Sequence, residues 1–581
     1  MGKPINHVTI VGGGTAGWMT ALLLQSLCQN DKRRKDALKV TLIESPNIPT
    51  VGVGEATVPG MPRTLRTAGV SEKEFMKRCN ASFKLGVLFD KWNVGNDGKP
   101  IGYVNPFARP PAVGGVDAGW YFAEHGAGEL DFTQVFSPCV DLARACKGPR
   151  PLGVGEFDQS VGFAYHLDAG KFSGMLRDIC IERGVEHILD DMVSVEQDER
   201  GYISGVILKE RGLHEIEFVI DCTGFRGLII NEALGEPFVS YSDVLANDRA
   251  LAVQIPHPEP DRLEPMTRST ALGAGWTWRV PLYSRIGTGY VFSSAHRSDD
   301  DAREEFLASL GPAGKDAEPR VIPMRVGRTR TAWVKNCVAI GLSGGFIEPL
   351  ESTAIHMIDT GVRWLVSYFP DLDFAEPLRD RYNKLVTQLY DEVRDFICLH
   401  YALGNRTDSQ YWIDVREELK VPDSLAANLE LWKHKLPAAY DIDFVSLFSP
   451  WTYQAVLLGK RVYETGYGDG QLQAAVTTDV SRWRDYLAKS RARTRQIVEA
   501  TADHRTLLKE LRGELDPEIL QAPAWLAAKK PAPMGQPNGP QATVQLPGLG
   551  APLSAKLRRA RKDAQDSPAE PQDKSEDISL L

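Results

Sequence analysis

The pattern of apolar and polar residues at the start of the chain indicates a βαβ unit. Residues 7–12 (HVTIVG) are a short apolar run typical of a buried strand, and the apolar stretch from about Ala16 to Cys28 predicts a helix. A polar loop follows, and residues 38–43 (LKVTLI) then predict a second strand. The glycine-rich turn after the first strand therefore opens a Rossmann-like unit.

Other periodicities follow along the chain. Ser71 and Glu74 have the spacing of a capping box, which predicts the start of a helix. Residues 201–220 alternate as paired strands do, and strand-forming residues are frequent around 276–295. These patterns predict a mixture of strands and helices in this part of the chain.

The pattern changes near residue 354 and divides the chain into three segments. We expect residues 1–353 to form a mixed α/β box with a Rossmann-like core. Residues 354–522 carry apolar residues at helical spacing, which predicts a mostly helical module. Residues 523–581 are rich in Pro, Gly, Gln and Ala and end in charged residues, a composition typical of a disordered tail.

The composition argues against several kinds of protein. The formal net charge of -9 argues against nucleic acid as the main partner. No stretch approaches the roughly 20 apolar residues that a membrane-spanning helix needs, and the histidines form no recognisable metal-binding pattern. The eight cysteines show no paired spacing, so we expect free thiols and a cytoplasmic protein.

The turn after the first strand, Gly12-Gly-Gly14-Thr15-Ala16-Gly17, has the form G-x-G-x-x-G. Its first glycine permits a tight turn, the second lets the backbone approach a pyrophosphate, and the third lets helix and strand pack closely. The helix N-terminus adds free N–H groups for phosphate, and Glu44 at the end of the second strand can accept hydrogen bonds from a ribose. The motif predicts a dinucleotide site without separating FAD from NAD, and the alternative is a purely structural turn.

Five further motifs follow in order along the chain. They are GVGEATVP at 52–59, ASFKLG at 81–86, DCTGFRG at 221–227, GWTWRVP at 275–281 and GLSGGFIEPLEST at 341–353. Together with the glycine motif they resemble the flavin-dependent tryptophan halogenase family, from residue 7 to about 410 and more loosely to about 510. The fourth motif looks like the family's G-W-x-W-x-I-P signature, with Val280 as a conservative change. The resemblance implies an FAD-binding box of the aromatic-hydroxylase type with a mostly helical module over the substrate site.

The resemblance also implies a reaction. Reduced FAD, oxygen and chloride or bromide give hypohalous acid, which travels through a tunnel to a lysine beside the substrate, and Lys84 matches that lysine. An ammonium can hydrogen-bond hypohalous acid and aim the halogen, whereas a neutral amine can form a haloamine, and both routes stay open. Glu351 matches the family's active-site carboxylate, which polarises the halogenating species or takes the ring proton. The alternatives are a surface charge for Lys84 and a helix N-terminal acid for Glu351.

Further positions match the family's halide, flavin and substrate contacts. Thr353 and Ala354 match the backbone halide site, where the family commonly has glycine in place of Ala354, so that access to positive φ is lost. Trp276 and Trp278 share one face of a strand and match a wall that keeps organic substrate away from the flavin, with core packing as the alternative. The implied flavin contacts are Gly54, Glu55, Ala56, Val193, Leu342 and Ile355.

The match to relatives that act on free tryptophan weakens in the helical module. The resemblance implies a paired-tyrosine segment and a nearby acid that reads the amino-acid head. The corresponding stretch here, 450–459 (PWTYQAVLLG), has one tyrosine, Tyr453, which is the expected substrate-chamber residue, and Gly459 and Lys460 stand near the expected acid. An indole derivative, a peptide-borne tryptophan or another aromatic is therefore as good a candidate as free tryptophan. Residues 100–165 either line an altered substrate chamber or form a long surface loop.

The sequence also bears on partners and on three alternative functions. No second motif for NAD(P)H is evident, so the resemblance implies a separate flavin reductase, and a homodimer is common on this scaffold. A flavin monooxygenase on the same fold would share the glycine motif but need neither Lys84 nor the tryptophan wall. A hydrolase would use Gly341-Leu-Ser343-Gly-Gly345, which fits G-x-S-x-G. A relative that only binds flavin or substrate is the third rival.

Overall fold

The predicted βαβ unit forms the centre of a mainly parallel sheet. The computed structural model describes residues 2–28, 38–48, 54–442, 447–463 and 478–516. The sheet order is β10-β2-β1-β14-β23-β22, and every pairing in it is parallel except that of β22 with β23. The elements are β1 (His7–Val11), α1 (Thr15–Cys28), β2 (Lys39–Glu44), β10 (Glu186–Leu189), β14 (Phe218–Asp221), β22 (Trp333–Val334) and β23 (Cys337–Ala339). Because parallel strands end at one edge, the glycine turn after β1 lies beside the end of β14.

A second, larger sheet is mostly antiparallel and carries the tryptophan motif. Its order is β20-β16-β19-β18-β17-β5-β6, and the pairing of β17 with β5 is parallel. Its strands are β5 (Gly86–Val94), β6 (Pro100–Pro106), β16 (Arg249–Ile255), β17 (Thr267–Leu272), β18 (Gly275–Pro281), β19 (Ile286–Phe292) and β20 (Arg320–Pro323). The strands expected around 276–295 are therefore β18 and β19, which pair with each other.

A small three-stranded sheet packs against the second large sheet. Strands β3 (Gly54–Ala56) and β4 (Ser82–Lys84) both pair with β9 (Ala164–Asp168), and β3 also packs against β18 and β19. The pairing expected within 201–220 is present between β12 and β13. The remaining strands are β7 (Ala112–Val113), β8 (Val116–Asp117), β11 (Met192–Gln197), β12 (Ile203–Leu208), β13 (Gly212–Glu215), β15 (Phe238–Ser240), β21 (Gly327–Thr329) and β24 (Gly345–Phe346).

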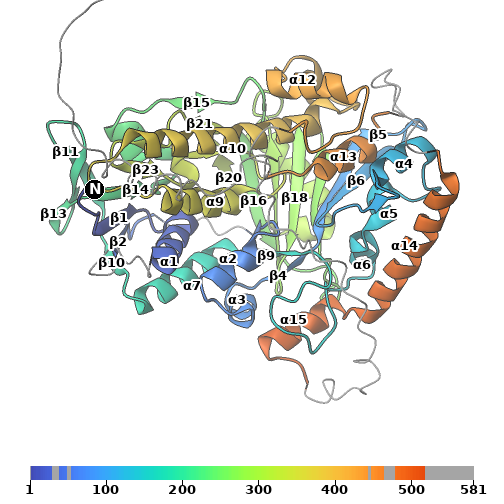
Figure 1. Cartoon of the computed structure of the whole chain (residues 1–581), viewed down its shortest axis with the longest axis horizontal. Helices are drawn as coiled ribbons and strands as arrows, with labels where there is room; N and C mark the ends of the chain where they lie inside the picture. Colours follow the sequence, from blue (N-terminus) through green and yellow to red (C-terminus); the bar gives the residue numbers. More distant parts are fainter. Residues whose placement is uncertain (1, 29–37, 49–53, 443–446, 464–477, 517–581) are drawn as a thin grey trace, which may run out of the picture. The chain divides into compact units, whose positions relative to one another are not determined.

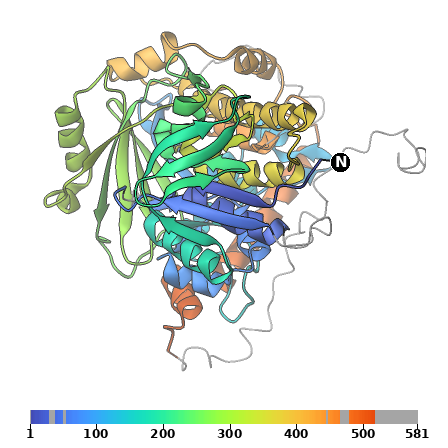
Figure 2. The ribbon, with the colours of Figure 1, turned by 90° about the vertical axis from the view of Figure 1, so that its left-hand side faces the viewer.

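The segment after residue 353 is helical, as predicted, over its described part. Helix α9 packs on α1, and the long α10 runs beside α9 and contacts β22 (Figures 1 and 2). None of the described helices has the length and apolar character needed to cross a membrane. The helices are α9 (Ala354–Ser367), α10 (Glu376–Ala402), α11 (Gln410–Glu417), α12 (Asp423–Trp432), α13 (Pro450–Gly459), α14 (Val480–Ala500) and α15 (His504–Arg512).

The predicted segment boundaries fare differently. The boundary at 353/354 coincides with the start of α9, although residues Met1–Pro531 cluster as one compact unit. A division into separate 1–353 and 354–522 domains therefore stays a prediction. The predicted tail, 523–581, lies outside the described residues.

Residues 100–165 are folded and are not a long surface loop. Besides β6 to β9, they contain the helices α4 (Ala118–His125), α5 (Phe132–Phe136) and α6 (Cys139–Arg144). Apolar side chains of α4 and α5 form one buried cluster with Leu436, Leu458 and Trp483 of the helical segment. Glycine and aromatic residues here serve turns and packing, a distinction that composition alone does not make.

The capping box at Ser71 is only half formed. Helix α3 (Glu72–Arg78) begins where expected, and the Ser71 hydroxyl accepts from the Glu74 N–H at 3.4 Å. The Glu74 carboxylate, however, accepts from Arg78 at 3.0 Å instead of returning to the cap. Glu156 adds two other bonds at this helix start, since it accepts from the Ser71 hydroxyl at 3.0 Å and from the Glu72 N–H at 2.8 Å.

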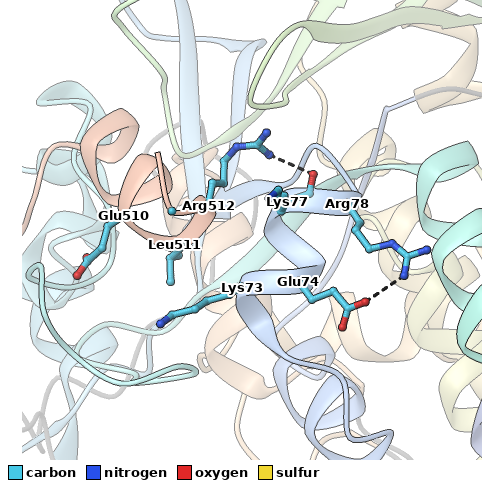
Figure 3. Close-up of a pocket in the computed structure, with 8 residues that line it drawn as sticks. Lys73, Glu74, Lys77, Arg78, Glu510, Leu511 and Arg512 are labelled. Atoms are coloured by element: carbon cyan, nitrogen blue, oxygen red, sulfur yellow. Dashed lines mark hydrogen bonds and ion pairs between the residues drawn. The ribbon is translucent and has the colours of Figure 1, made fainter. Parts of the chain in front are cut away.

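Helix α15 returns the chain to α3. Arg512 donates to the backbone carbonyls of Met76 (2.9 Å) and Lys77 (3.2 Å), and a surface groove lies between the two helices (Figure 3). The groove is lined by Lys73, Glu74, Lys77, Arg78, Glu510, Leu511, Arg512 and Gly513. None of the predicted site residues lines it. The remaining helices are α2 (Met61–Thr67), α7 (Ala169–Glu182) and α8 (Asp299–Ser309).

Candidate active site

The three motif glycines occupy the positions that a dinucleotide fold requires. Gly12 has a φ of +117°, and a Cβ there would lie 2.2 Å from the Cys222 carbonyl oxygen. A Cβ on Gly17 would lie 1.9 Å from the Gly12 oxygen, so helix and strand can pack only with glycine. A Cβ on Gly14 would meet no protein atom within 4 Å. The space over Gly14 thus leaves the backbone and the start of α1, at Thr15 and Ala16, open to a pyrophosphate, and the residues present fit FAD.

Glu44 is in place at the end of β2 but already has a protein partner. Its Oε2 lies 3.0 Å from His187 Nε2. A Cβ on Gly13 would lie 2.5 Å from Glu44 Oε1, so the carboxylate rests against the glycine turn. His187 orients the carboxylate there, and a ribose contact through Oε1 stays a prediction.

The other predicted flavin contacts lie on several elements. Gly54, Glu55 and Ala56 are strand β3, where Gly54 packs against Gly287, and burial together with Asp168 raises the pKa of Glu55 to about 7. Ile355 is buried in α9, whereas the apolar side chains of Leu342 and Val193 are 38% and 64% exposed. Leu342 lies on a 3-10 turn (Gly341–Ser343) that contacts α1 and α9, beside the glycine motif. An apolar side chain exposed there is consistent with a flavin contact, which stays a prediction.

Lys84 is the last residue of β4 and is completely buried. Its ammonium donates to the Thr57 carbonyl oxygen at 3.0 Å and lies 5.2 Å from the centre of the Phe107 ring. Burial lowers the pKa of Lys84 to about 7, and the negative charge of Glu351 opposes that shift. The alternative of a surface charge is therefore wrong. Near neutral pH, both the ammonium and the amine are populated.

Glu351 lies in the turn before α9 and is held from the protein side through one oxygen. Asn105 Nδ2 donates to Glu351 Oε1 at 3.0 Å, and His400 Nε2 lies 3.3 Å from the same atom. Glu351 and Lys84 influence each other electrostatically but form no direct ion pair. A gap between an ammonium and a carboxylate is the arrangement in which a reacting group can contact both.

The turn that carries Glu351 is conformationally unusual. Ser352 has a φ of +60°, which is rare for a residue other than glycine and is typical of strained functional turns. Thr353 is the N-cap of α9, with φ of -85° and ψ of -18°, and Ala354 is the first residue of the helix. The positive φ thus falls on Ser352, so alanine at 354 fits without strain. The halide role of Thr353 and Ala354 stays a prediction.

Trp276 and Trp278 contact each other, as the shared strand face predicts. Their ring centres are 6.5 Å apart at an angle of 62°. The Trp276 indole N–H is fully buried and donates to Glu348 Oε2 at 2.9 Å. Trp278 is only partly buried, and its ring lies over Gly289, where a Cβ would be 2.0 Å from it. Trp276 therefore packs in the core, and Trp278 presents the accessible part of the predicted wall.

Tyr453 is buried in an aromatic cluster of the helical segment. The centre of its ring lies 4.9 Å from that of Phe396 and 5.2 Å from that of Trp432. The ring centres of Phe396 and His400 are in turn 5.1 Å apart. A contact of Tyr453 with substrate stays a prediction. A Cβ on Gly459 would lie 2.5 Å from the Tyr103 Cβ, so a longer side chain does not fit at that position.

Sequence reasoning missed four side chains that surround the two catalytic candidates. Asn105 and Phe107 lie within and just after β6, and His400 lies near the end of α10. Tyr103 approaches the site through His400, with 2.5 Å between its hydroxyl and His400 Nδ1. The available signal was a pair of polar residues, Asn105 and His400, within otherwise apolar stretches of predicted elements.

Ser343 cannot serve as the nucleophile of the hydrolase alternative. Its hydroxyl is buried and donates to the backbone carbonyls of Asp221 (2.5 Å) and Ile340 (3.2 Å). A hydroxyl bound in this way closes a turn and does not face a substrate.

The comparisons with known proteins agree with this geometry. The family model described as tryptophan halogenase matches residues 7–475. The chain belongs to the tryptophan halogenase family. It is 36% identical over 531 residues to the 7-chloro-L-tryptophan 6-halogenase KtzR of Kutzneria sp. (strain 744), which covers 87% of this chain and 99% of the relative.

Solved structures of the family show the same fold. A tryptophan halogenase from Shewanella frigidimarina superposes with a TM-score of 0.82 at 34% identity, covering 88% of this chain and 99% of that one. Tar14, a tryptophan C-6 flavin-dependent halogenase (chlorinase) from taromycin biosynthesis, gives a TM-score of 0.80 at 36% identity, covering 87% and 100%. This halogenase therefore uses FADH2, oxygen and halide, and needs a flavin reductase and an aromatic substrate.

Proposed function

We propose that this halogenase places chlorine or bromine on an electron-rich indole-type carbon, with Lys84 aiming the halogen and Glu351 taking the ring proton. The observation that carries the proposal is the pair itself. A completely buried ammonium and a buried carboxylate influence each other without direct contact, beside the Phe107 ring. Bound reduced FAD would supply the electrons with which oxygen and halide give hypohalous acid.

Lys84 and Glu351 can together donate and accept the protons that the halogen transfer requires. The Lys84 ammonium donates a proton to the oxygen of hypohalous acid while the halogen–oxygen bond breaks and the carbon–halogen bond forms, so that water leaves. The ring proton passes to Glu351 and can return to the Lys84 amine. A pKa of about 7 also populates the amine, which could carry the halogen as a haloamine. The geometry supports the use of Lys84 in either route.

The substrate that we propose is an indole without an obligatory free amino-acid head. Of the two residues near the expected acid, Gly459 has no room for a side chain because Tyr103 packs against it. Lys460 is buried and donates to Asn93 Oδ1 at 2.6 Å. Neither offers a carboxylate to an ammonium group, so an indole derivative or a peptide-borne tryptophan is favoured over free tryptophan.

We also propose a cytoplasmic location and a homodimeric assembly. All eight cysteines are free thiols, and six are buried, which supports a cytoplasmic location. A homodimer stays a prediction that light scattering on the purified protein would check.

A mass-spectrometric halogenation assay tests the proposal. The enzyme is mixed with flavin reductase, NADH, FAD, oxygen and bromide, and is offered indole, tryptophan and a tryptophan-containing peptide beside the Lys84→Ala variant. We expect a monobrominated product from indole or the peptide, and loss of that product in the variant. Equal product from both proteins would exclude the role of Lys84. Oxygenated product alone would favour the monooxygenase alternative for this site.

A further inference from the structure

Two buried polar side chains, His400 and Tyr103, lead away one after the other from the Glu351 carboxylate. Tyr103, His400 and Glu351 are all buried, and their exposed fractions are 3%, 0% and 4%. The Tyr103 hydroxyl lies 2.5 Å from His400 Nδ1, and His400 Nε2 lies 3.3 Å from Glu351 Oε1. We propose that His400, oriented by Tyr103, is a positioning residue for Glu351 that leaves Glu351 Oε2 to take the ring proton. This inference rests on the proposed function of Glu351.

Burial determines the protonation states of the Tyr103 and His400 side chains. Burial raises the pKa of the Tyr103 hydroxyl well above its ordinary value, so the hydroxyl keeps its proton and donates to His400 Nδ1. Burial also lowers the pKa of His400, which is therefore a neutral imidazole. With Nδ1 accepting, the single ring proton sits on Nε2, the atom nearest Glu351.

The orientation of the imidazole is fixed by stacking as well as by Tyr103. The Phe89 ring stacks on Tyr103 at 4.6 Å and 5°, and on His400 at 4.7 Å and 18°. The Lys460 ammonium lies 5.5 Å from the centre of the Tyr103 ring. The plane of the His400 ring is thus fixed, with Nε2 as the ring nitrogen near Glu351.

Both protein donors converge on one oxygen of the carboxylate. Asn105 Nδ2 donates to Oε1 at 3.0 Å, and His400 faces that same atom. Among the described residues, no hydrogen bond is made to Oε2. A carboxylate oxygen without hydrogen bonds is the more basic of the two, so the ring proton should go to Oε2.

The His400 contact is not yet a full hydrogen bond. The Nε2–H direction departs from the line to Oε1, and Nε2 has no well-aligned acceptor. Catalytic hydrogen bonds are often loose before substrate is bound and tighten with it.

Three variants separate positioning from packing. His400→Phe keeps the ring stack but removes the donor, whereas His400→Gln can accept from Tyr103 and donate to Glu351. Tyr103→Phe removes the hydroxyl alone. His296→Phe is a matched control, because His296 is a partly buried histidine that pairs with Asp414 at 3.0 Å outside this chain of residues.

The readout is bromination by the enzyme loaded with reduced FAD, using indole and ring-deuterated indole in single turnovers. If Glu351 Oε2 is no longer held in position, loss of the ring proton becomes slower than formation of the carbon–halogen bond, and a primary isotope effect appears. We expect His400→Phe to slow product formation by about tenfold to a hundredfold, which is less than the roughly 10²–10⁴-fold contributed by a general base itself, and to show that isotope effect. Tyr103→Phe should change the rate of product formation and the isotope effect in the same direction but by less. His400→Gln should resemble wild type in both quantities.

The outcomes distinguish this inference from the proposed function. If wild type does not halogenate, the proposed function fails. If wild type halogenates and His400→Phe matches it in rate and isotope effect, His400 has no positioning role. If His400→Phe fails to bind FAD or to fold, the other two variants decide. The positioning role is supported if His400→Gln reacts at the wild-type rate and Tyr103→Phe is slowed with an isotope effect. It is overturned if His400→Gln and Tyr103→Phe are both slowed without an isotope effect.

Discussion

Two buried lysines in this halogenase have the same electrostatic property and different surroundings. Lys84 ends the edge strand β4, and Lys460 caps the C-terminus of α13. Both are completely buried, and burial lowers the pKa of each to about 7. A pKa near neutrality is typical of catalytic lysines but also arises in structural sites, so it does not identify the catalytic one.

The difference lies in the neighbours. The Lys84 ammonium donates to a backbone carbonyl and is influenced by the negative charge of Glu351. The Lys460 ammonium donates to the Asn93 side chain and is influenced by the positive charge of Arg406. A carboxylate close to the ammonium but not paired with it leaves room for chemistry, whereas the Lys460 environment only accommodates a charge.

The largest expected effect is on activity when each lysine becomes methionine. Lys84→Met should lose halogenation by at least about a hundredfold, since a positioned acid or base contributes about 10²–10⁴-fold. Lys460→Met should stay within about tenfold, the effect of ~1.4 kcal/mol on a barrier. Single-turnover bromination of indole measures both, with FAD binding as the control for folding. Equal losses in the two variants would show that burial alone matters.

The second effect comes from the carboxylate that distinguishes the two sites. Glu351→Gln should slow halogenation by about a hundredfold through loss of the base. Since the charge of Glu351 raises the pKa of Lys84, its removal should move the Lys84 titration to a pH below about 7. The pH profile of single-turnover halogenation would show the shift.

Glu392→Gln is the matched control for this experiment. Glu392 is a largely buried glutamate of α10 whose pKa burial raises to about 7, and it accepts from the Phe448 N–H at 3.0 Å. Its replacement should leave the pH profile unchanged. An unchanged profile in Glu351→Gln would remove the electrostatic link between Glu351 and Lys84.

Local sequence patterns carried the prediction where the structural cause is local. The spacing of Gly12, Gly14 and Gly17 predicted the turn because its steric demands involve few neighbouring atoms. Lys84 and Glu351 were predicted by resemblance, and their burial could not be read from their residue types. The boundaries of the helices were predicted only approximately.

Contacts between distant residues were beyond the sequence alone. Asn105 donates to Glu351 across 246 positions, and Tyr103 pairs with His400 across 297. No periodicity or motif spacing encodes such a pair, because the fold creates it. The same reason hid His504, whose Nε2 accepts from the Phe83 N–H at 3.0 Å across 421 positions.

The strand that carries Lys84 is bonded to the helical segment through His504, and we expect this bond to contribute to stability. Phe83 precedes Lys84 on β4, and its outward N–H bonds to His504, whose Nδ1 donates to the Leu263 carbonyl at 2.9 Å. His504→Leu leaves that N–H buried without a partner and should lower the free energy of unfolding by about 1–3 kcal/mol. Chemical unfolding of His504→Leu beside wild type measures it. No loss of stability would show that the bond is dispensable.

The same histidine gives a pH dependence with a defined sign. Burial lowers the pKa of His504 to about 4 from its ordinary 6.5, so the unfolded chain binds the extra proton first as the pH falls. The contribution of His504 to stability is therefore complete above pH 6.5 and is lost as the pH falls to about 4. The difference in unfolding free energy between wild type and His504→Leu should shrink across that window.

The smallest expected effect is on the pH dependence of the free energy of unfolding, in which Lys84 and Lys460 should be alike. Each has a folded pKa of about 7 against an ordinary value of 10.5, so between these values the unfolded chain binds the extra proton. The stability of wild type should therefore rise with pH in this window, by at most about 1.4 kcal/mol per pH unit for each lysine. Lys84→Met and Lys460→Met should each remove one such contribution, and chemical unfolding from pH 7 to pH 10 measures the slopes. Equal slopes beside unequal activities would locate the difference between the two lysines in the nearby carboxylate, because burial would then act on both alike. A slope lost in one variant only would mean that the two sites already differ in burial, before any chemistry is considered.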